Sequence, residues 1–197
     1  HLFDKIIAYS HEDLDKHILS SVAFNFNKGG GYWSWKPFII DKTLEKMSEN
    51  DILVYCDAGC TINKSKKWNK LLKDIDSNDI VASLIQATNI RWCRNNVLKY
   101  FKSNGKYWPF FNQVSASHLF VRKNSRTSVF IKKWKNLSIN RPDLLLDVPP
   151  NEIRNESKFF IENRYDQSIL NGLIYNNIEI MKIKLIWSNF DNRSFFK

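Results

Sequence analysis

Glycine, proline and cysteine are all scarce in this sequence. Its 197 residues include 6 Gly, 5 Pro and 3 Cys, too few for a collagen-like, low-complexity or disordered chain. Three cysteines cannot all pair with one another, and Cys56, Cys60 and Cys93 have neither a disulfide framework nor the spacing of a zinc knuckle. We therefore expect free thiols and a reducing compartment.

Long apolar runs are absent as well. No stretch approaches the ~20 residues that cross a bilayer, and no signal peptide is recognisable, so we expect a cytoplasmic protein. The composition is that of a folded protein, with 43% hydrophobic residues that include 14 Phe, 7 Trp and 7 Tyr. This length fits a single domain over 1–197, with a long loop over 141–163 and a tail over 187–197.

Acidic residues are outnumbered by basic ones. The chain has 30 Lys and Arg against 20 Asp and Glu, a net charge of +10, which favours anionic partners. Much of the excess lies in two lysine runs, over 64–73 and 132–135. Two interpretations stay open: both runs are solvated helix faces, or the run over 64–73, with the basic excess, attaches the protein peripherally to the anionic inner face of a membrane.

Apolar and polar segments alternate in a way that indicates strands and helices in turn. Short apolar stretches predict strands over 3–9, 51–56, 80–85 and 178–186, and 113–122 alternates as a half-buried strand does. Helical spacing predicts helices between them, beginning near Ser10, Pro37, Asn63, Ser125 and Asp166. This order predicts an α/β fold with a mixed, mainly parallel sheet and helices on both faces. Ligands bind beyond the carboxyl ends of strands in such sheets, which singles out Ser10 and Asp57.

The first candidate segment is GGGYWSWKP at 29–37. Glycines allow backbone to approach a ligand closely, while Trp33 and Trp35 offer stacking faces and Lys36 a phosphate contact. The competing interpretation is a glycine turn followed by a helix that packs both Trp in the core. The spacing of a phosphate-binding P-loop is absent.

Two further segments place an aspartate at the end of a secondary structure element. In YCDAGC at 55–60, Asp57 follows an apolar strand and could hold Mg²⁺ or Mn²⁺ against two phosphates, or cap a turn. In ENRYDQSIL at 162–170, Asp166 falls at a helix start, where the dipole stabilises a negative charge and lowers its basicity. There the competing role is an N-cap.

The three segments together resemble a family of nucleotide-sugar glycosyltransferases with the GT-A fold. The shared motifs read G-Y-W-x-W-K-P at 31–37, Y-x-D-A-G at 55–59 and D-Q-S-I at 166–169, and the resemblance extends over about 3–175. It implies a single-domain GT-A-like, Rossmann-like fold, a donor such as a UDP-sugar, a glycan or glycolipid acceptor, and a divalent cation, Mn²⁺ or Mg²⁺. Polysaccharide or lipopolysaccharide synthesis is the setting it implies.

The resemblance also implies roles for individual residues. Asp57 matches the first acid of the D-x-D motif, but Gly59 stands where the second acid would be. Either Asp57 coordinates the cation with water and phosphates, with Asp191 as a candidate second metal ligand, or basic residues neutralise the diphosphate. We expect Asp166 to be the catalytic carboxylate, a base in an inverting enzyme or a positioning group in a retaining one. The expected donor contacts are Tyr9, Ser10, Trp33, Lys36, Asp57, Ala58 and Gly59, and the expected sugar contacts are Gln113, Arg164 and Gln167.

Two other functions compete with sugar transfer. The basic charge and the 14% aromatic content would suit a nucleic-acid-binding or processing domain, although no groove-reading motif is recognisable and we expect no nucleic acid partner. The glycine at position 59 would suit a non-catalytic sugar-binding domain on the same fold.

Overall fold

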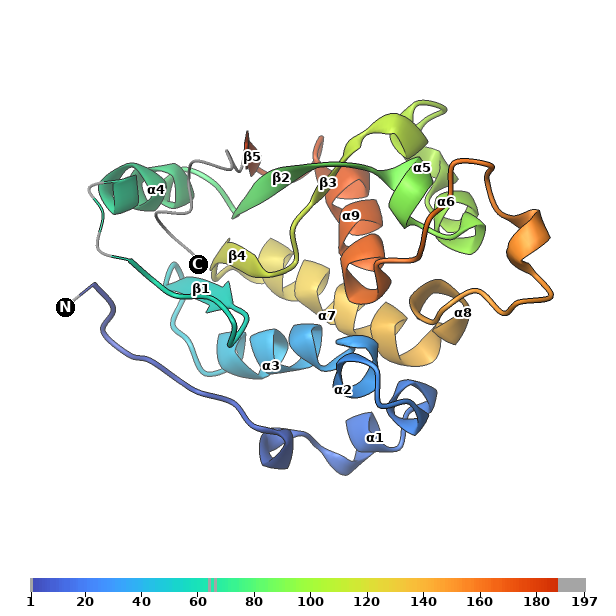
Figure 1. Ribbon diagram of the computed structural model, residues 1–197. Coiled ribbons are helices and arrows are strands. Elements are labelled where there is room, and N and C mark those ends of the chain that lie inside the picture. The colour runs from blue at the N-terminus through green and yellow to red at the C-terminus, as the bar shows by residue number, and fades with distance from the viewer. Residues whose placement is uncertain (1, 64, 66, 188–197) are drawn as a thin grey trace.

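Five strands form one open, mixed sheet in the computed structural model, which describes residues 2–63, 65 and 67–187 (Figure 1). The strands are β1 (Ile52–Cys56), β2 (Ile80–Thr88), β3 (Asn112–Val114), β4 (His118–Arg122) and β5 (Ile183–Trp187). Their order is β1-β4-β2-β3, with β5 also paired to β2. Only β2 and β5 pair in parallel, whereas β1 with β4, β4 with β2, and β2 with β3 are antiparallel. The α/β class and the mixed sheet are confirmed, and the expectation of a mainly parallel sheet is wrong.

The expected strand over 3–9 lies outside the described sheet. The segment is extended, but Ile6 is 83% exposed and no strand pairs with it. Its larger side chains pack on helices instead: the Phe3 ring meets that of Trp68 edge-on, and the Tyr9 hydroxyl contacts Thr43. An apolar, β-branched pattern indicates extended backbone. Such a segment becomes a strand only where it can pair with a free edge of the sheet.

The expected strand over 113–122 divides into two. β3 pairs with the second half of β2, and β4 passes between β1 and β2. Ser115 to Ser117 form the connection between these two pairings. This division places the backbone of Ala116 and Ser117 beside the end of β1, where the carbonyl of Ser117 accepts the amide of Asp57 at 2.8 Å.

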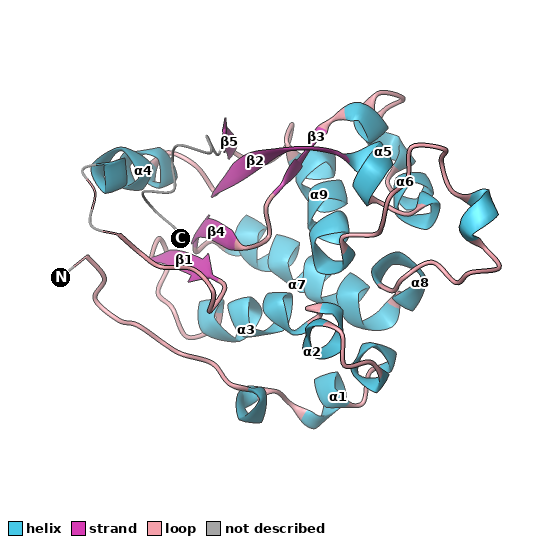
Figure 2. Ribbon diagram, viewed as in Figure 1, coloured by secondary structure: helices cyan, strands magenta, loops and turns pink. Residues whose placement is uncertain are grey.

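Helices fill the connections between strands (Figure 2). Their bounds are α1 (Lys16–Leu19), α2 (Gly29–Tyr32), α3 (Trp35–Leu44), α4 (Lys67–Asp76), α5 (Asn89–Trp92), α6 (Asn95–Tyr100), α7 (Ser125–Asn140), α8 (Pro142–Leu145) and α9 (Tyr165–Asn177). Short 3-10 turns cover His11–Asp13, Val22–Asn25, Lys102–Asn104, Trp108–Phe110 and Ile153–Asn155. The helices predicted near Pro37, Asn63, Ser125 and Asp166 are confirmed, and Pro37 lies in the first turn of α3, where its missing N–H costs no hydrogen bond.

Each face of the sheet is covered by helices, as expected. The larger core joins one face to α3, α7 and α9, with fully buried side chains such as Ile80, Leu119, Trp134 and Ile169. Alternate residues of the same strands, Val81 and Phe120, point to the other face and pack against Trp68, Leu71 and Ile75 of α4. This alternation follows from the two-residue period of a strand.

Polar contacts tie the three helices of the larger core together. Lys135 of α7 forms an ion pair with the buried carboxylate of Asp41 on α3. The indole Nε1 of Trp134 on α7 donates to the backbone carbonyl of Asp166 on α9 at 3.0 Å. These contacts join α7 to the second half of α3 and to the first turn of α9. None of the described helices has both the length and the apolarity needed to span a bilayer.

Candidate active site

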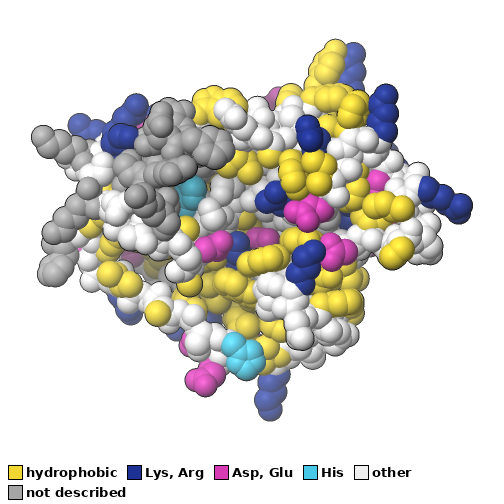
Figure 3. All heavy atoms as spheres, in the orientation of Figure 1, with side chains coloured by type: hydrophobic (Ala, Val, Ile, Leu, Met, Phe, Trp, Pro, Cys, Tyr) yellow, Lys and Arg dark blue, Asp and Glu magenta, His cyan; other side chains and the backbone are white. Residues whose placement is uncertain are grey.

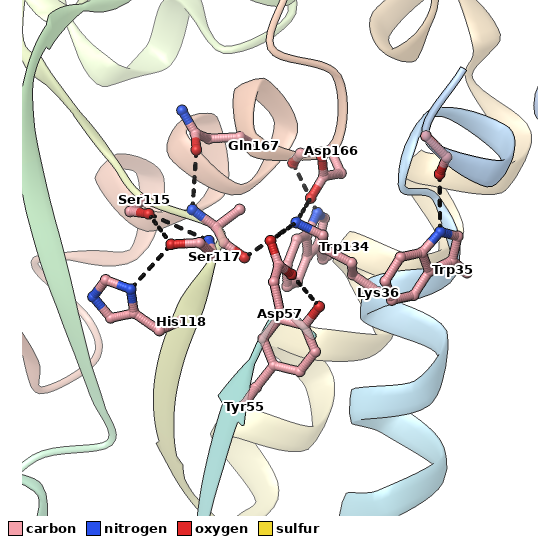
Figure 4. A network of polar contacts seen from close by, with 12 residues as sticks. Trp35, Lys36, Tyr55, Asp57, Ser115, Ser117, His118, Trp134, Asp166 and Gln167 are labelled. Carbon is pink, nitrogen blue, oxygen red and sulfur yellow. Dashed lines mark hydrogen bonds and ion pairs between the residues drawn. The ribbon is translucent and has the colours of Figure 1, made fainter. Parts of the chain in front are cut away.

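Lys36, Asp57 and Asp166 meet at one point in the fold (Figure 4). Lys36 is in the first turn of α3, Asp57 directly follows β1, and Asp166 is in the first turn of α9. The ammonium Nζ of Lys36 lies 3.1 Å from Oδ2 of Asp57 and 3.7 Å from Oδ2 of Asp166. It also lies 3.4 Å from the carbonyl oxygen of Ala116. The structure thus brings together one charged residue from each of the three sequence motifs.

Asp57 is the most accessible member of this cluster, with 29% of its side chain exposed, against 6% for Lys36 and 4% for Asp166. Its Oδ1 accepts a hydrogen bond from the Tyr55 hydroxyl at 2.5 Å. Burial is the larger cause and this hydrogen bond the second cause of a raised pKa for Tyr55. The hydroxyl therefore keeps its proton and stays a donor. A side chain at Gly59, two residues further along the chain, would meet no atom within 4 Å.

Asp166 is buried and is not an N-cap. The cap of α9 is Arg164, and Asp166 is the second helical residue. Within the described chain its Oδ2 accepts no hydrogen bond. Burial raises the pKa of Asp166 to about 7; Lys36 opposes this shift, and the charge of Asp57 adds to it. The expectation of a low pKa from the helix start is wrong, because burial outweighs the dipole.

The backbone around this cluster is strained. Tyr165 has φ of 51° and Trp33 has φ of 56°, values that are uncommon for aromatic residues. The two rings stack with centroids 5.6 Å apart and planes 19° apart. Gly29 is also left-handed, and a Cβ there would lie 2.4 Å from the Trp33 ring. Such strain persists only where surrounding contacts hold it, and it concentrates at functional sites.

Asp147 is a site residue that the motifs did not indicate. It accepts hydrogen bonds from the hydroxyls of Tyr32 at 3.0 Å and Tyr165 at 3.1 Å, and from the Lys28 ammonium at 3.2 Å. It lies just after α8, in the segment over 141–163, which contains α8 and a 3-10 turn rather than the one long loop expected. Arg94 donates to its backbone carbonyl at 3.3 Å. Asp147 therefore fastens the long loop to the glycine-aromatic segment and to the first residue of α9.

The predicted sugar contacts Gln113 and Gln167 bond to one another. Nε2 of Gln167 donates to Oε1 of Gln113 at 2.7 Å, and Oε1 of Gln167 accepts the amide of Ala116 at 3.0 Å. Gln113 is fully buried. The third, Arg164, lies 4.0 Å over the ring of Trp92. These bonds brace α9 against the β3–β4 connection, and direct sugar contacts by the three residues stay predictions.

A chain of hydroxyls and an imidazole runs beside the cluster, and no motif indicated it. Ser115 and Ser117 Oγ lie 2.7 Å apart, Ser117 Oγ lies 3.1 Å from Nδ1 of His118, and Nε2 of His118 lies 2.7 Å from Ser83 Oγ (Figure 4). Burial lowers the pKa of His118 to about 4, against the opposing effect of Asp57. The imidazole is therefore neutral at pH 7.

Tyr9 and Ser10 lie in a different place from the charged cluster. They line an apolar hollow of about 290 Å³ together with Leu14, Phe24, Phe26, Asn27, Gly30 and Trp35. Lys36, Asp57 and Asp166 are not part of its wall. In Figure 4 the Trp35 indole turns away from the cluster, toward the backbone of the glycine segment. The expected nucleoside contacts of Tyr9 and Ser10 are thus on the other side of α3 from Asp57.

A divalent cation could be held by Asp57, but not by this carboxylate alone. No group of three or more His, Cys, Asp or Glu side chains suited to a metal occurs in the described part of the chain. The predicted second ligand, Asp191, lies outside the described residues. Magnesium binds in many enzymes through one or two carboxylates, water and substrate phosphates, and the partly exposed Asp57 carboxylate fits that pattern.

Comparison of the chain with protein-family models, curated proteins and solved structures found no match. Inference about function therefore depends on the motifs and on the geometry of the cluster. Figure 3 shows acidic and basic side chains gathered across the middle of one face, with hydrophobic side chains around them.

Proposed function

We propose that this protein is a glycosyltransferase that moves a sugar from a nucleotide-diphosphate donor, with a UDP-sugar as the expected donor, to a glycan or glycolipid acceptor. The observation that carries the proposal is the meeting of Lys36, Asp57 and Asp166 from three distant segments. Each segment matches one motif of the family that the sequence resembles. A GT-A-like fold is part of the proposal, and Asp57 at the carboxyl end of β1 supports it.

The proposed role of Asp57 and Lys36 is to stabilise the diphosphate leaving group. Asp57 is the accessible carboxylate and would hold Mg²⁺ or Mn²⁺ together with phosphate oxygens. The cation, when bound, neutralises charge as it develops on the diphosphate. Lys36 keeps its ammonium at this point through contacts with Asp57 and the Ala116 carbonyl, so that it too can contact a phosphate.

The proposed role of Asp166 is to accept the proton of the acceptor hydroxyl. As the acceptor oxygen bonds to the anomeric carbon, the bond from that carbon to the diphosphate oxygen breaks and its electron pair leaves with the nucleoside diphosphate. The hydroxyl proton passes to Asp166. A pKa near 7 suits a general base at neutral pH, and this favours inversion over retention of configuration.

A thermal-shift panel of nucleotides and nucleotide-sugars, with and without Mn²⁺, tests the donor class. A ligand at 100 times its dissociation constant adds ~2.7 kcal/mol to stability, so one nucleotide class should shift the midpoint clearly, and Asp57→Asn should remove the part that depends on Mn²⁺. The matched control is Asp143→Asn, since Asp143 pairs with Arg141 away from the cluster.

Release of the nucleoside diphosphate in the presence of donor and Mn²⁺ then tests transfer. Absence of any nucleotide-dependent shift would contradict the proposal. Salt-dependent binding of random DNA, unaffected by nucleotides, would indicate a nucleic-acid-binding domain instead. A shift with a nucleotide-sugar that is never hydrolysed or transferred would indicate a non-catalytic sugar-binding domain.

A further inference from the structure

The hollow beside α3 has polar atoms in its wall that are already bonded to the protein. Thr43 donates its hydroxyl proton to the carbonyl of Ile39 at 2.7 Å, so the Tyr9 hydroxyl is the donor in its 2.9 Å contact with Thr43. The indole Nε1 of Trp35 donates to the Gly29 carbonyl at 3.1 Å. The amide and the hydroxyl of Ser10 both donate to Oδ2 of Asp13. These donors are unavailable to a bound molecule.

This pattern argues against a nucleobase in the hollow. Bases are recognised through the hydrogen-bonding groups of their edges, and a site that buries those groups without partners loses affinity. The remaining wall is made of hydrocarbon and aromatic surface from Leu14, Phe24, Phe26 and Trp35. Among the described residues that line it, the exposed polar side chains are Ser10, His11 and Asn27, and the Ser10 hydroxyl proton is already donated to Asp13.

The surroundings of the hollow are apolar and accessible. Phe26, which lines the hollow, is 43% exposed. Val22, at the start of the 3-10 turn that precedes Phe26, is 48% exposed. In Figure 3 hydrophobic side chains lie open below the row of charged side chains that crosses this face. Exposed apolar surface next to an apolar hollow is typical of a binding site for an apolar group.

We propose that this hollow binds a hydrocarbon chain, the alkyl or isoprenoid part of the acceptor, while the acceptor's sugar stays outside it. The binding of a chain follows from the hollow itself, and its role as part of the acceptor rests on the function proposed above. The segment over 29–37 connects the two places: Gly30 and Trp35 line the hollow, and Lys36, next along the chain, contacts Asp57. An amphiphilic acceptor would thus be held on one side of α3 and react on the other side of its first turn.

Calorimetric titration with n-alkyl β-glucosides from butyl to octyl, below their micelle concentrations, tests chain binding without any nucleotide-sugar. Burial of each methylene in the hollow should tighten binding about fourfold, and binding should show a negative heat-capacity change. Equal affinity for all chain lengths, or no binding, overturns the inference.

Two variants locate the chain. Leu14→Trp fills the hollow and should abolish the dependence on chain length, whereas Val129→Trp, at an exposed position of α7, should leave it unchanged. Phe26→Ser removes apolar surface at an exposed position and should weaken octyl glucoside binding at least threefold, with Phe110→Ser as its exposed control. If circular dichroism shows that Leu14→Trp is unfolded, Phe26→Ser decides. Wild-type binding in both hollow variants overturns the location.

Kinetics with a confirmed donor test the role in transfer. The KM of an octyl-linked acceptor should be lower than that of the free sugar, and Leu14→Trp should remove that advantage. Equal KM values for the two acceptors would overturn the acceptor role while the calorimetric result stands. If no donor is used at all, the proposed function fails, and binding of the alkyl series still decides whether the hollow holds a chain.

Discussion

Lys36 and Asp57 form an ion pair at the junction of α3 and β1, with 3.1 Å between Nζ and Oδ2. The ammonium is almost fully buried and is also 3.7 Å from the buried Asp166. One positive charge thus stands between a partly exposed carboxylate, Asp57, and a buried one, Asp166. Loss of the ammonium would leave the Asp166 carboxylate buried without a neighbouring counter-charge, which is costly.

The first prediction concerns removal of that ammonium. Lys36→Met should lower the free energy of unfolding by about 3 kcal/mol at pH 8, and by less at pH 5, where Asp166 holds its proton. Urea denaturation at the two pH values measures this. Lys132→Met is the control, since Lys132 pairs with Glu45 on the surface and such pairs contribute little. Wild-type stability of Lys36→Met at pH 8 would show that the ion pair is not structural.

The second prediction concerns Asp166. Its folded-state pKa of about 7 lies above the ordinary value of 3.8, so the folded protein holds a proton that the unfolded chain releases between these pH values. Stability of the wild type should therefore fall as pH rises from about 4 to about 7. Asp166→Asn should lack this fall and be more stable at pH 8, by on the order of 2–4 kcal/mol. Denaturant titrations from pH 4 to pH 8 measure the difference.

Activity of the same variant separates catalysis from structure. Asp166→Asn should reduce turnover by ~10²-fold or more at saturating donor and acceptor, while Asp143→Asn should not. A variant that is both more stable and inactive would show that the buried carboxylate is kept for function. Near-normal turnover would instead make Asp166 a structural residue and refute the catalytic assignment.

The third prediction concerns the contacts of Asp147. Asp147→Ala removes the acceptor shared by Tyr32, Tyr165 and Lys28, so the loop over 148–160 should be cleaved faster in limited proteolysis. The free energy of unfolding should fall by about 1 kcal/mol, which leaves the protein folded. The KM for the donor should nevertheless rise, because Asp147 positions the residues beside the donor site. Asp143→Ala, which breaks the pair with Arg141 at the start of α8, is the matched control. Equal cleavage of both variants would contradict a specific role of Asp147.

The parts of the site that the sequence predicted are those with a local cause. Asp57 follows a short apolar run that forms β1, and Pro37 marks the first turn of α3. The helical spacing that begins near Ser125 likewise corresponds to α7. In these elements the hydrophobic period agrees with the tertiary packing, so the local sequence is enough to predict them.

The parts that could not be predicted have distant causes. Whether 3–9 pairs as a strand depends on which sheet edges are free, and those are formed by later segments. The contact of Asp147 with Tyr32 joins residues 115 positions apart, and no short motif records it. The pKa shift of Asp166 is opposite to the expected one for the same reason. Its place at a helix start is local, but the burial that raises its pKa comes from the packing of α9 against distant segments.

The last prediction concerns the lysine-rich helix α4. Trp68, Leu71 and Ile75 pack on the sheet, while Lys70 and Lys73 are exposed; Lys64 and Lys66 lie outside the described residues. Each basic residue near an anionic membrane contributes about 1 kcal/mol. If α4 faces a membrane, the double variant Lys70→Gln and Lys73→Gln should bind phosphatidylserine vesicles roughly 30-fold more weakly than the wild type in sedimentation assays.

The matched control changes two exposed lysines of α7 in the same way, with Lys132→Gln and Lys133→Gln. It alters the net charge by the same amount, so an effect of charge alone would weaken both variants equally, whereas attachment through α4 weakens only the first. Because surface electrostatics are screened by salt, the difference should shrink as ionic strength rises. Wild-type binding that does not distinguish anionic from neutral vesicles would show that the lysines of α4 form a solvated helix face.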